Sequence, residues 1–130
     1  MSPQLMMSSC SVRDPLEPAE AWEMLWRPEG KRLWLAEDMA LETRVGGRVI
    51  QSLEGLPWRS GVVAEWKEKE NILLMLDIPT SWKLVGVSQA MIRLMPSAKK
   101  YTTIQIEESG VPIDRIPMVN GYWMMLLTRI

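Results

Sequence analysis

The spacing of apolar residues changes along the chain, and each change predicts a different kind of element. Apolar residues every three or four positions indicate a helix, whereas strict alternation indicates a strand with one buried face. Residues 4–13 alternate only weakly and predict an edge strand. The next stretch, residues 14–26, has helical spacing, and Trp22, Leu25 and Trp26 fall on its buried face.

Proline and glycine divide this helical region. Pro18 suits the first turn of the first helix, where its missing N–H costs nothing. The Arg-Pro-Glu-Gly stretch at 27–30 then breaks the helix, because proline and glycine are poor helix formers. A short second helix is predicted over 31–36, with Leu33 and either Trp34 or Leu35 facing inward.

After Asp38 the spacing becomes two residues and predicts strands. One face of the first carries Met39, Leu41, Thr43 and Val45, opposite Glu42 and Arg44. Further strands are expected at 48–55, within 60–70, and at 72–78, 88–95 and 101–108. Turns are expected at 67–71 and 96–100, and the sheet is expected to end at 109–112. Consecutive strands joined by short turns form an antiparallel sheet.

The Gly46–Gly47 pair stands between two of these strands. A two-residue hairpin needs positive φ angles, which glycine adopts freely. A phosphate-binding glycine loop would instead lead into a helix, and here a strand follows. The pair therefore predicts a tight hairpin turn. Its flanking Arg44 and Arg48 are expected to face solvent or to pair with acids such as Glu42.

The last segment predicts the helix that covers the sheet. It begins near Asp114 or Pro117 and carries an apolar stripe of Val119, Trp123, Leu126 or Leu127, and Ile130. The expected architecture is α+β in a single domain, 1–130. A curved antiparallel sheet of six or seven strands wraps around the C-terminal helix, and two short helices follow the first strand.

Composition excludes several classes of function. A net charge of −1 argues against nucleic-acid binding and against a polybasic membrane surface. No apolar run is long enough for a transmembrane helix, and the first residues do not resemble a signal peptide. The single cysteine, Cys10, fits a reducing cytoplasm. Without histidine the chain can form neither a Ser-His-Asp nor a Cys-His site, so neither a metal nor a cofactor is expected.

Three stretches resemble one known family. "PAEAWEMLWRPEGKRLWLA", "LETRVGGRV" and "ESGVP…NGYW" are similar in order and spacing to the START-like (SRPBCC) superfamily, and most to the branch named for homologues of the activator of the ninety-kilodalton heat-shock protein ATPase. The resemblance covers nearly all of Ser11 to Ile130, with Thr80 to Val87 as an exception. It implies the helix-grip fold, in which an apolar cavity often lies between the sheet and the last helix. The chain departs from the family in lacking histidine and in its short final helix.

The resemblance implies a binding protein for an apolar or aromatic, lipid-like molecule. The candidate cavity lining is Trp34, Met39, Leu41, Trp58, Trp66, Met75, Met91, Tyr122, Trp123 and Leu126. The candidate polar anchors are Arg44, Gln51, Arg93 and Tyr101. Ordinary core packing is the competing interpretation of each apolar residue, since Met and Trp replace phenylalanine throughout this chain.

Two other classes of function stay open. A partner-binding regulator, such as a chaperone activator, would show exposed tryptophans, for example Trp58 or Trp82 in loops. An enzyme would need acid–base chemistry from Asp77, Glu65, Glu42 or Tyr101. The three carboxylates among these groups are more typical of solvated strand faces. Cys10 lacks the usual activating base. The last helix is short and could leave one end of the cavity uncovered, so a homodimer whose interface covers that end is a further option.

Overall fold

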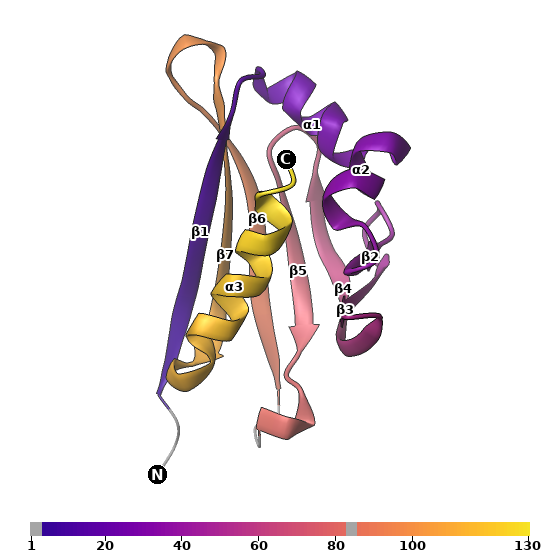
Figure 1. Ribbon diagram of the computed structural model, residues 1–130, viewed down its shortest axis with the longest axis vertical. Helices are drawn as coiled ribbons and strands as arrows, with labels where there is room; N and C mark the ends of the chain where they lie inside the picture. The colour runs from indigo at the N-terminus through magenta and orange to yellow at the C-terminus, as the bar shows by residue number, and fades with distance from the viewer. Residues whose placement is uncertain (1–3, 83–85) are drawn as a thin grey trace.

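The computed structural model describes residues 4–82 and 86–130. They form one antiparallel sheet of seven strands in the order β1-β7-β6-β5-β4-β3-β2 (Figure 1). The strands are β1 (Leu5–Asp14), β2 (Met39–Leu41), β3 (Arg48–Leu53), β4 (Leu56–Lys67), β5 (Asn71–Asp77), β6 (Val87–Pro96) and β7 (Thr102–Pro112). The predicted helix-grip architecture is confirmed. Residues 83–85, part of the segment placed before the strand at 88–95, lie outside the described residues.

Helices cover one face of the sheet. The α-helices are α1 (Pro18–Trp26), α2 (Pro28–Leu35) and α3 (Ile116–Leu127), and the short 3-10 turns are η1 (Thr80–Trp82), η2 (Ala98–Lys100) and η3 (Ile113–Arg115). In Figure 1, α3 crosses the side of the sheet that holds β1 and β7, whereas α1 and α2 lie beside β3 and β4. The core therefore lies between one sheet face and two separate helical layers.

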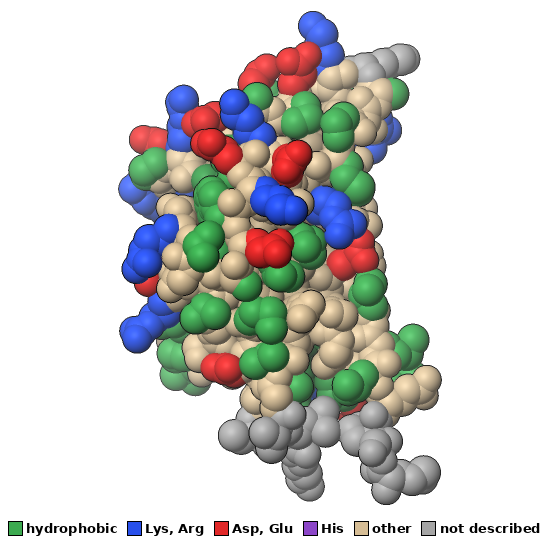
Figure 2. Space-filling view, turned by 180° about the vertical axis from the view of Figure 1, so that it is seen from behind, with side chains coloured by type: hydrophobic (Ala, Val, Ile, Leu, Met, Phe, Trp, Pro, Cys, Tyr) green, Lys and Arg blue, Asp and Glu red, His purple; other side chains and the backbone are tan. Residues whose placement is uncertain are grey.

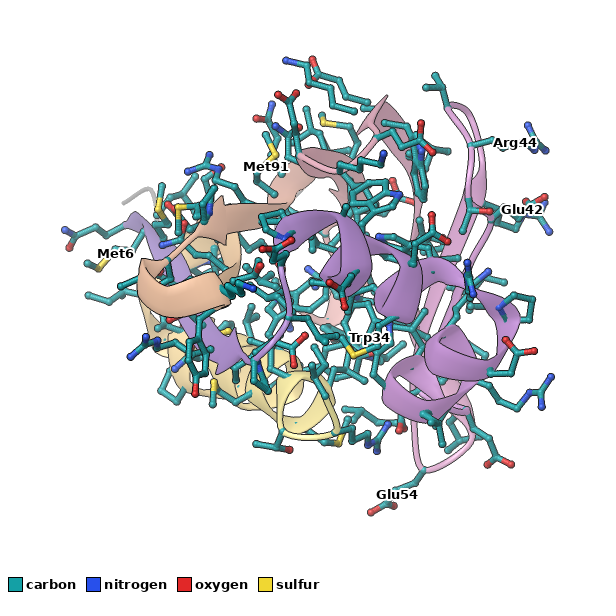
Figure 3. All side chains as sticks on the ribbon, turned by 90° about the horizontal axis from the view of Figure 1, so that it is seen from above. Met6, Trp34, Glu42, Arg44, Glu54 and Met91 are labelled. Atoms are coloured by element: carbon teal, nitrogen blue, oxygen red, sulfur yellow. The ribbon has the colours of Figure 1, made fainter. Side chains whose placement is uncertain are left out.

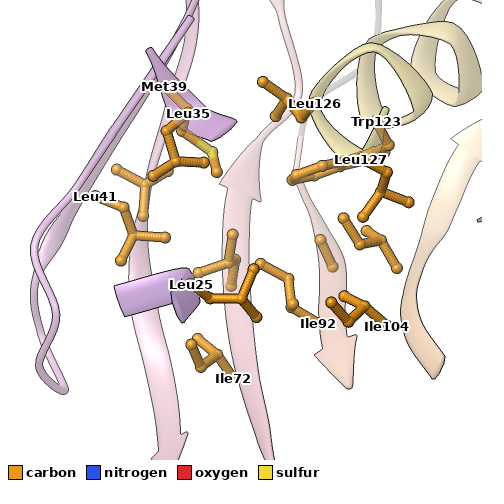
Figure 4. Close-up of a cluster of buried hydrophobic side chains, with 14 of the residues drawn as sticks. Leu25, Leu35, Met39, Leu41, Ile72, Ile92, Ile104, Trp123, Leu126 and Leu127 are labelled. Atoms are coloured by element: carbon orange, nitrogen blue, oxygen red, sulfur yellow. The ribbon is translucent and has the colours of Figure 1, made fainter. Parts of the chain in front are cut away.

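Strand alternation sends every second side chain into this core. In β5, Ile72, Leu74 and Leu76 are fully buried, while the residues between them are half-buried on the other face. Leu25 of α1 and Trp123 of α3 belong to the same buried cluster as this row, and Figure 4 shows Leu25 close to Ile72. The predicted stripe of α3 is confirmed at Val119, Trp123, Leu126 and Leu127, all of which are buried.

The helix pair differs from the prediction at both ends. Asp14 belongs to β1, and α1 begins at Pro18, where the proline ring fits the first turn. The break between the helices is a single residue, Arg27, because Pro28 begins α2. Leu33 was expected to face inward but is 72% exposed, so the buried face of α2 consists of Trp34 and Leu35.

The Gly46–Gly47 turn is longer than predicted. β2 ends at Leu41 and β3 begins at Arg48, so six residues connect them, and Val45 is exposed. Gly46 has φ of +79° and donates its N–H to the Val63 carbonyl at 2.8 Å. A Cβ on Gly47 would lie 2.3 Å from the carbonyl oxygen of Glu42. The glycines therefore dock the loop closely against itself and β4.

The tight two-residue hairpin lies one strand further on. Glu54 and Gly55 both have positive φ, 52° and 80°, between the paired residues Leu53 and Leu56. This turn starts β4 earlier than predicted and places Trp58 on a strand rather than in a loop. The sheet also extends to Pro112, because β7 continues through the Ser-Gly-Val-Pro stretch that was expected to end it.

Candidate functional site

A row of polar side chains crosses the interior between the sheet and α3. Gln51, Arg59, Ser88 and Glu108 come from β3, β4, β6 and β7, and all four are buried. Arg59 and Glu108 form a two-point ion pair, with Nη1 to Oε2 at 2.6 Å and Nη2 to Oε1 at 2.8 Å. Neither side chain has any exposed surface.

The other residues of the row form hydrogen bonds with this ion pair. Arg59 Nε donates to Gln51 Oε1 at 2.6 Å, and Ser88 Oγ donates to Glu108 Oε2 at 2.8 Å. The indole N–H of Trp123 donates to Glu108 Oε1 at 3.0 Å. Both carboxylate oxygens of Glu108 are thus occupied as acceptors. This arrangement holds α3 to the sheet and leaves Glu108 poorly placed to take a proton from a substrate.

Aromatic rings surround the polar row. The Arg59 guanidinium lies over the Trp58 ring at 4.5 Å, which is a favourable cation–π geometry. Trp58 in turn packs against Trp82 of η1 and Tyr122 of α3. The Tyr122 hydroxyl donates to the Asp38 carbonyl. Burial, together with the charge of Asp38, raises the pKa of Tyr122 well above its usual range.

Four other tryptophans gather at the opposite end of the interior. Trp22 of α1 packs edge-on against Trp66 of β4, with ring centroids 5.2 Å apart. Trp26 packs against Trp66 at a tilt, 5.4 Å apart, and edge-on against Trp34 at 5.5 Å. Trp34 Nε1 donates to the Leu25 carbonyl at 2.9 Å. The buried Nε1 of Trp26 has no partner in the part of the chain that the structure describes. This end is held mainly by ring packing.

An apolar pocket of about 180 Å³ opens beside this tryptophan cluster. It is lined by Met24, Gly30, Leu33, Trp34, Arg129 and Ile130, from α1, α2 and the segment after α3. Gly30 lets α2 approach α1 closely beside the pocket, because a Cβ there would lie 1.6 Å from the carbonyl oxygen of Met24. In Figure 3, Trp34 lies centrally between the helices.

Arg129 closes one side of the pocket. Its guanidinium donates to Asp38 Oδ2 at 2.7 Å and to the Trp34 carbonyl at 3.3 Å. The charge of Arg129 is therefore already balanced by a neighbouring carboxylate. Such a wall favours a neutral occupant over an anion, since an anion would meet the charge of Asp38 as well.

The structure brings together only part of the predicted cavity lining. Trp58, Tyr122 and Trp123 surround the polar row, and Met39 touches it through Gln51 Nε2 at 3.5 Å. Trp34 lines the pocket and Trp66 belongs to the tryptophan cluster. Leu41 and Leu126 are ordinary buried core residues.

Two predicted lining residues lie on the other face of the sheet. Met75 and Met91 are half-buried and alternate with the fully buried Leu74, Ala90 and Ile92, so they point away from α3. Figure 3 shows Met91 on the outside of the sheet. Neither methionine can line the interior. Both faces of these strands carry several apolar side chains, so sequence alternation alone does not identify the inner one.

Of the predicted polar anchors, only Gln51 lies inside. Arg44 is exposed and pairs with Glu42 at 3.2 Å. Arg93 pairs with Glu107 at 3.4 Å on the outer face, where basic and acidic side chains are interspersed with apolar ones (Figure 2). Tyr101 is 37% exposed beneath the Arg13 guanidinium. These three side chains lie at the surface and do not line the interior.

The two residues at the centre of the polar row, Arg59 and Glu108, were not among the predicted site residues. Arg59 follows Pro57 and Trp58 in a stretch that was not assigned to a strand, and Glu108 was only the last residue of the strand expected at 101–108. The only signal for their burial was their position along the strands. Once β4 begins at Leu56 and β7 continues past Ser109, both residues alternate onto the same face as Val63 and Ile106.

The groups considered for acid–base chemistry lie apart from one another. Asp77 accepts from Ser60 Oγ at 3.3 Å on the surface, and Glu65 is exposed. The backbone N–H of Arg48, with help from nearby Arg44, holds the pKa of Glu42 below its usual value. Burial raises the pKa of Cys10 to about 11, which makes its thiol a poor nucleophile.

Within residues 4–82 and 86–130, no group of three His, Cys, Asp or Glu side chains is placed to hold a metal ion. No helix formed by these residues is long and apolar enough to cross a membrane.

Comparison with known proteins shows the fold. No family model matches the chain, and neither does any curated protein. Among solved structures, the Aha1 dimer of Colwellia psychrerythraea superposes with a TM-score of 0.72 at 16% identity, over 95% of this chain and 91% of that chain. CalU16 of Micromonospora echinospora gives 0.70 at 15% identity, over 98% and 83% of the two chains. PFC0360w, an HSP90 activator of Plasmodium falciparum, gives 0.62 at 13% identity, over 82% and 74%. The chain has the fold of these proteins.

Proposed function

We propose that this protein is a non-catalytic binding domain for a small, neutral aromatic molecule. The supporting observation is the apolar pocket of about 180 Å³ at the mouth of the interior, walled by the indole of Trp34. Small-molecule sites are concave, mostly apolar and carry few polar groups. The pocket lies between the helix pair and the end of α3. The proposed ligand therefore lies at the edge of the interior, and not in its packed centre as the sequence predicted.

The size of the pocket limits the ligand. An apolar protein cavity of about 150 Å³ can hold benzene, so one or two fused rings are the expected scale here. A long lipid chain would extend out of the pocket. Leu33, at the rim, is 72% exposed, and a bound ring would cover part of its apolar surface. Removing that surface from water supplies the driving force for binding.

The partner-binding alternative has weaker support. The Plasmodium neighbour is an HSP90 activator, but an anchor for a protein partner would normally include exposed aromatic residues. All seven tryptophans of this chain are buried or half-buried, including Trp58 and Trp82. The tryptophans therefore face inward, where they can contact a small molecule.

Calorimetric titration with indole and naphthalene tests the proposal. Leu33→Asp should weaken binding at least about tenfold, because a charge at the rim must lose water when the ring enters. Since Leu33 is exposed, the variant should keep its fold. Val62→Asp is the matched control, because Val62 is 47% exposed on β4 and lines no part of this pocket.

Two results would contradict the proposal. One is the absence of binding by any one-ring or two-ring compound at millimolar concentration. The other is binding that Leu33→Asp and Val62→Asp weaken equally. A third comparison tests the ligand class: indole-3-acetate should bind more weakly than indole, because Asp38 already neutralises Arg129.

A further inference from the structure

The two edges of the sheet differ in how they are protected from pairing with another strand. Exposed strand edges carry unpaired N–H and C=O groups, and proteins blunt them with short strands, charges, prolines, bulges or covering loops. β2 is three residues long, and the charged Glu42 and Arg44 follow it directly. The edge formed by β2 is therefore blunted.

The edge formed by β1 has few of these protections. β1 is ten residues long and pairs with β7 on one side, while no other strand of the described sheet lies on its second side. From Leu5 to Val12 it carries no charged residue and no proline. Its only charges, Arg13 and Asp14, lie at one end.

The irregularity in this strand pair belongs to β7. Met6 pairs with Val111 and Ser8 pairs with Glu108, so three steps along β7 match two along β1. Gly110, with φ of +79°, accommodates the extra residue, as expected for a glycine bulge. β1 is therefore regular at this position, and the bulge does not interrupt its free side.

Apolar side chains concentrate at one end of the same edge. Leu5, Met6 and Met7 are 53%, 44% and 52% exposed. Ile113 of η3 and Met118 of α3 are also exposed, and η3 continues directly from the Pro112 that pairs with Leu5. In Figure 3, Met6 projects from the side of the molecule opposite to Glu42 and Arg44. This edge joins free backbone groups to apolar surface.

We propose that β1 pairs antiparallel with β1 of a second copy of this chain, which forms one continuous sheet through the dimer. The occupant must be a strand, because only a strand satisfies a row of N–H and C=O groups. A second copy brings no like charges together. A two-fold axis near the middle of β1 sets Arg13 and Asp14 of each copy against the uncharged Leu5 end of the other. This inference does not depend on ligand binding.

A charge-swap experiment tests the pairing. Met7 and Ser9 are exposed and lie near the middle of β1, so charges there should leave the monomer folded. Wild-type protein is expected to sediment as a dimer. Met7→Lys/Ser9→Lys and Met7→Glu/Ser9→Glu should each weaken dimerisation at least about 100-fold, because like charges then meet across the axis. An equimolar mixture of the two variants should restore dimers.

Ala40→Lys on the opposite edge is the control and should leave dimerisation unchanged, since Ala40 is exposed on β2. A wild-type chain that stays monomeric at millimolar concentration would overturn the proposal. Dimers that persist in both double variants, or a mixture that stays monomeric, would do the same. Circular dichroism of each variant distinguishes loss of pairing from loss of the fold.

Discussion

The two ends of the interior are built from similar aromatic residues but are held in different ways. At the polar end, Trp123 donates to Glu108, which is paired with Arg59. At the apolar end, Trp26 packs against three other indoles while its own N–H has no partner among the described residues. The polar end contains a buried ion pair, although Trp58 Nε1 there also has no partner among the described residues. The apolar end relies mainly on ring packing and has one indole hydrogen bond, from Trp34 to the Leu25 carbonyl.

This difference indicates which end can change. A satisfied buried network rigidifies its surroundings, because any shift leaves a polar group without a partner. Ring packing tolerates small movements, since no single contact is strong. The pocket of about 180 Å³ lies at the apolar end, where a ligand can be accommodated. The polar end fixes α3 against four strands of the sheet.

The largest expected effect comes from breaking the ion pair. Glu108→Gln should destabilise the protein by about 3–5 kcal/mol, because it leaves the Arg59 charge buried without its counter-charge. The double variant Arg59→Met/Glu108→Leu should recover most of that loss, since no buried charge then remains. Urea unfolding followed by circular dichroism measures both. If the single variant were as stable as wild type, the polar end would not be the rigid one.

The same substitution at both ends gives the next largest effect. Trp123→Phe should cost about 1–3 kcal/mol more than Trp26→Phe, because only the first removes a hydrogen bond from a buried carboxylate. Both variants lose a similar ring volume, so the difference isolates the bond. Their urea midpoints provide the measurement. Equal losses would show that the bond from Trp123 to Glu108 adds no net stability.

The smallest expected effect is a dependence on alkaline pH that belongs to the polar end. The raised pKa of Tyr122 means that its stabilising contribution is complete below the ordinary tyrosine pKa and is lost as pH rises through the folded value. Stability should fall by up to about 1.4 kcal/mol per pH unit above about pH 10.

The alkaline measurement needs a Cys10→Ala background, because the pKa of Cys10 is raised to about 11 and acts in the same direction. In that background Tyr122→Phe should flatten the slope, whereas Trp26→Phe should leave it unchanged. A slope that survives Tyr122→Phe would assign the effect to other groups.

Much of the fold could be predicted from the sequence. The order of elements followed from the change in apolar spacing at Asp38 and from the stripe of α3. The turns were harder, because glycine has two uses. Gly46 and Gly47 were assigned the tight hairpin, yet Glu54 and Gly55 form it, and Gly47 is needed for close backbone approach. A sequence shows where a glycine is, but not whether it is needed for a positive φ angle or for close backbone approach.

The candidate site was less predictable for a related reason. Arg59 and Glu108 lie 49 residues apart, and nothing local distinguishes them from the surface pairs formed by Arg44 and Arg93. Their burial depends on where each strand begins and on which face α3 covers. The pocket similarly depends on the approach of α2 to α1 at Gly30, which local spacing does not encode.

The pairing of β1 with β7 also has a consequence for synthesis on the ribosome. Strands β3 to β7 can pair with their sequence neighbours as they emerge, whereas Val12 must wait for Ile104. Contacts of such long separation form late, because closing the loop costs entropy first. During that delay the uncharged Leu5–Val12 segment has neither β7 nor a second copy to pair with. We expect the nascent chain to be most prone to aggregation, and most dependent on chaperones, until β7 has left the ribosome.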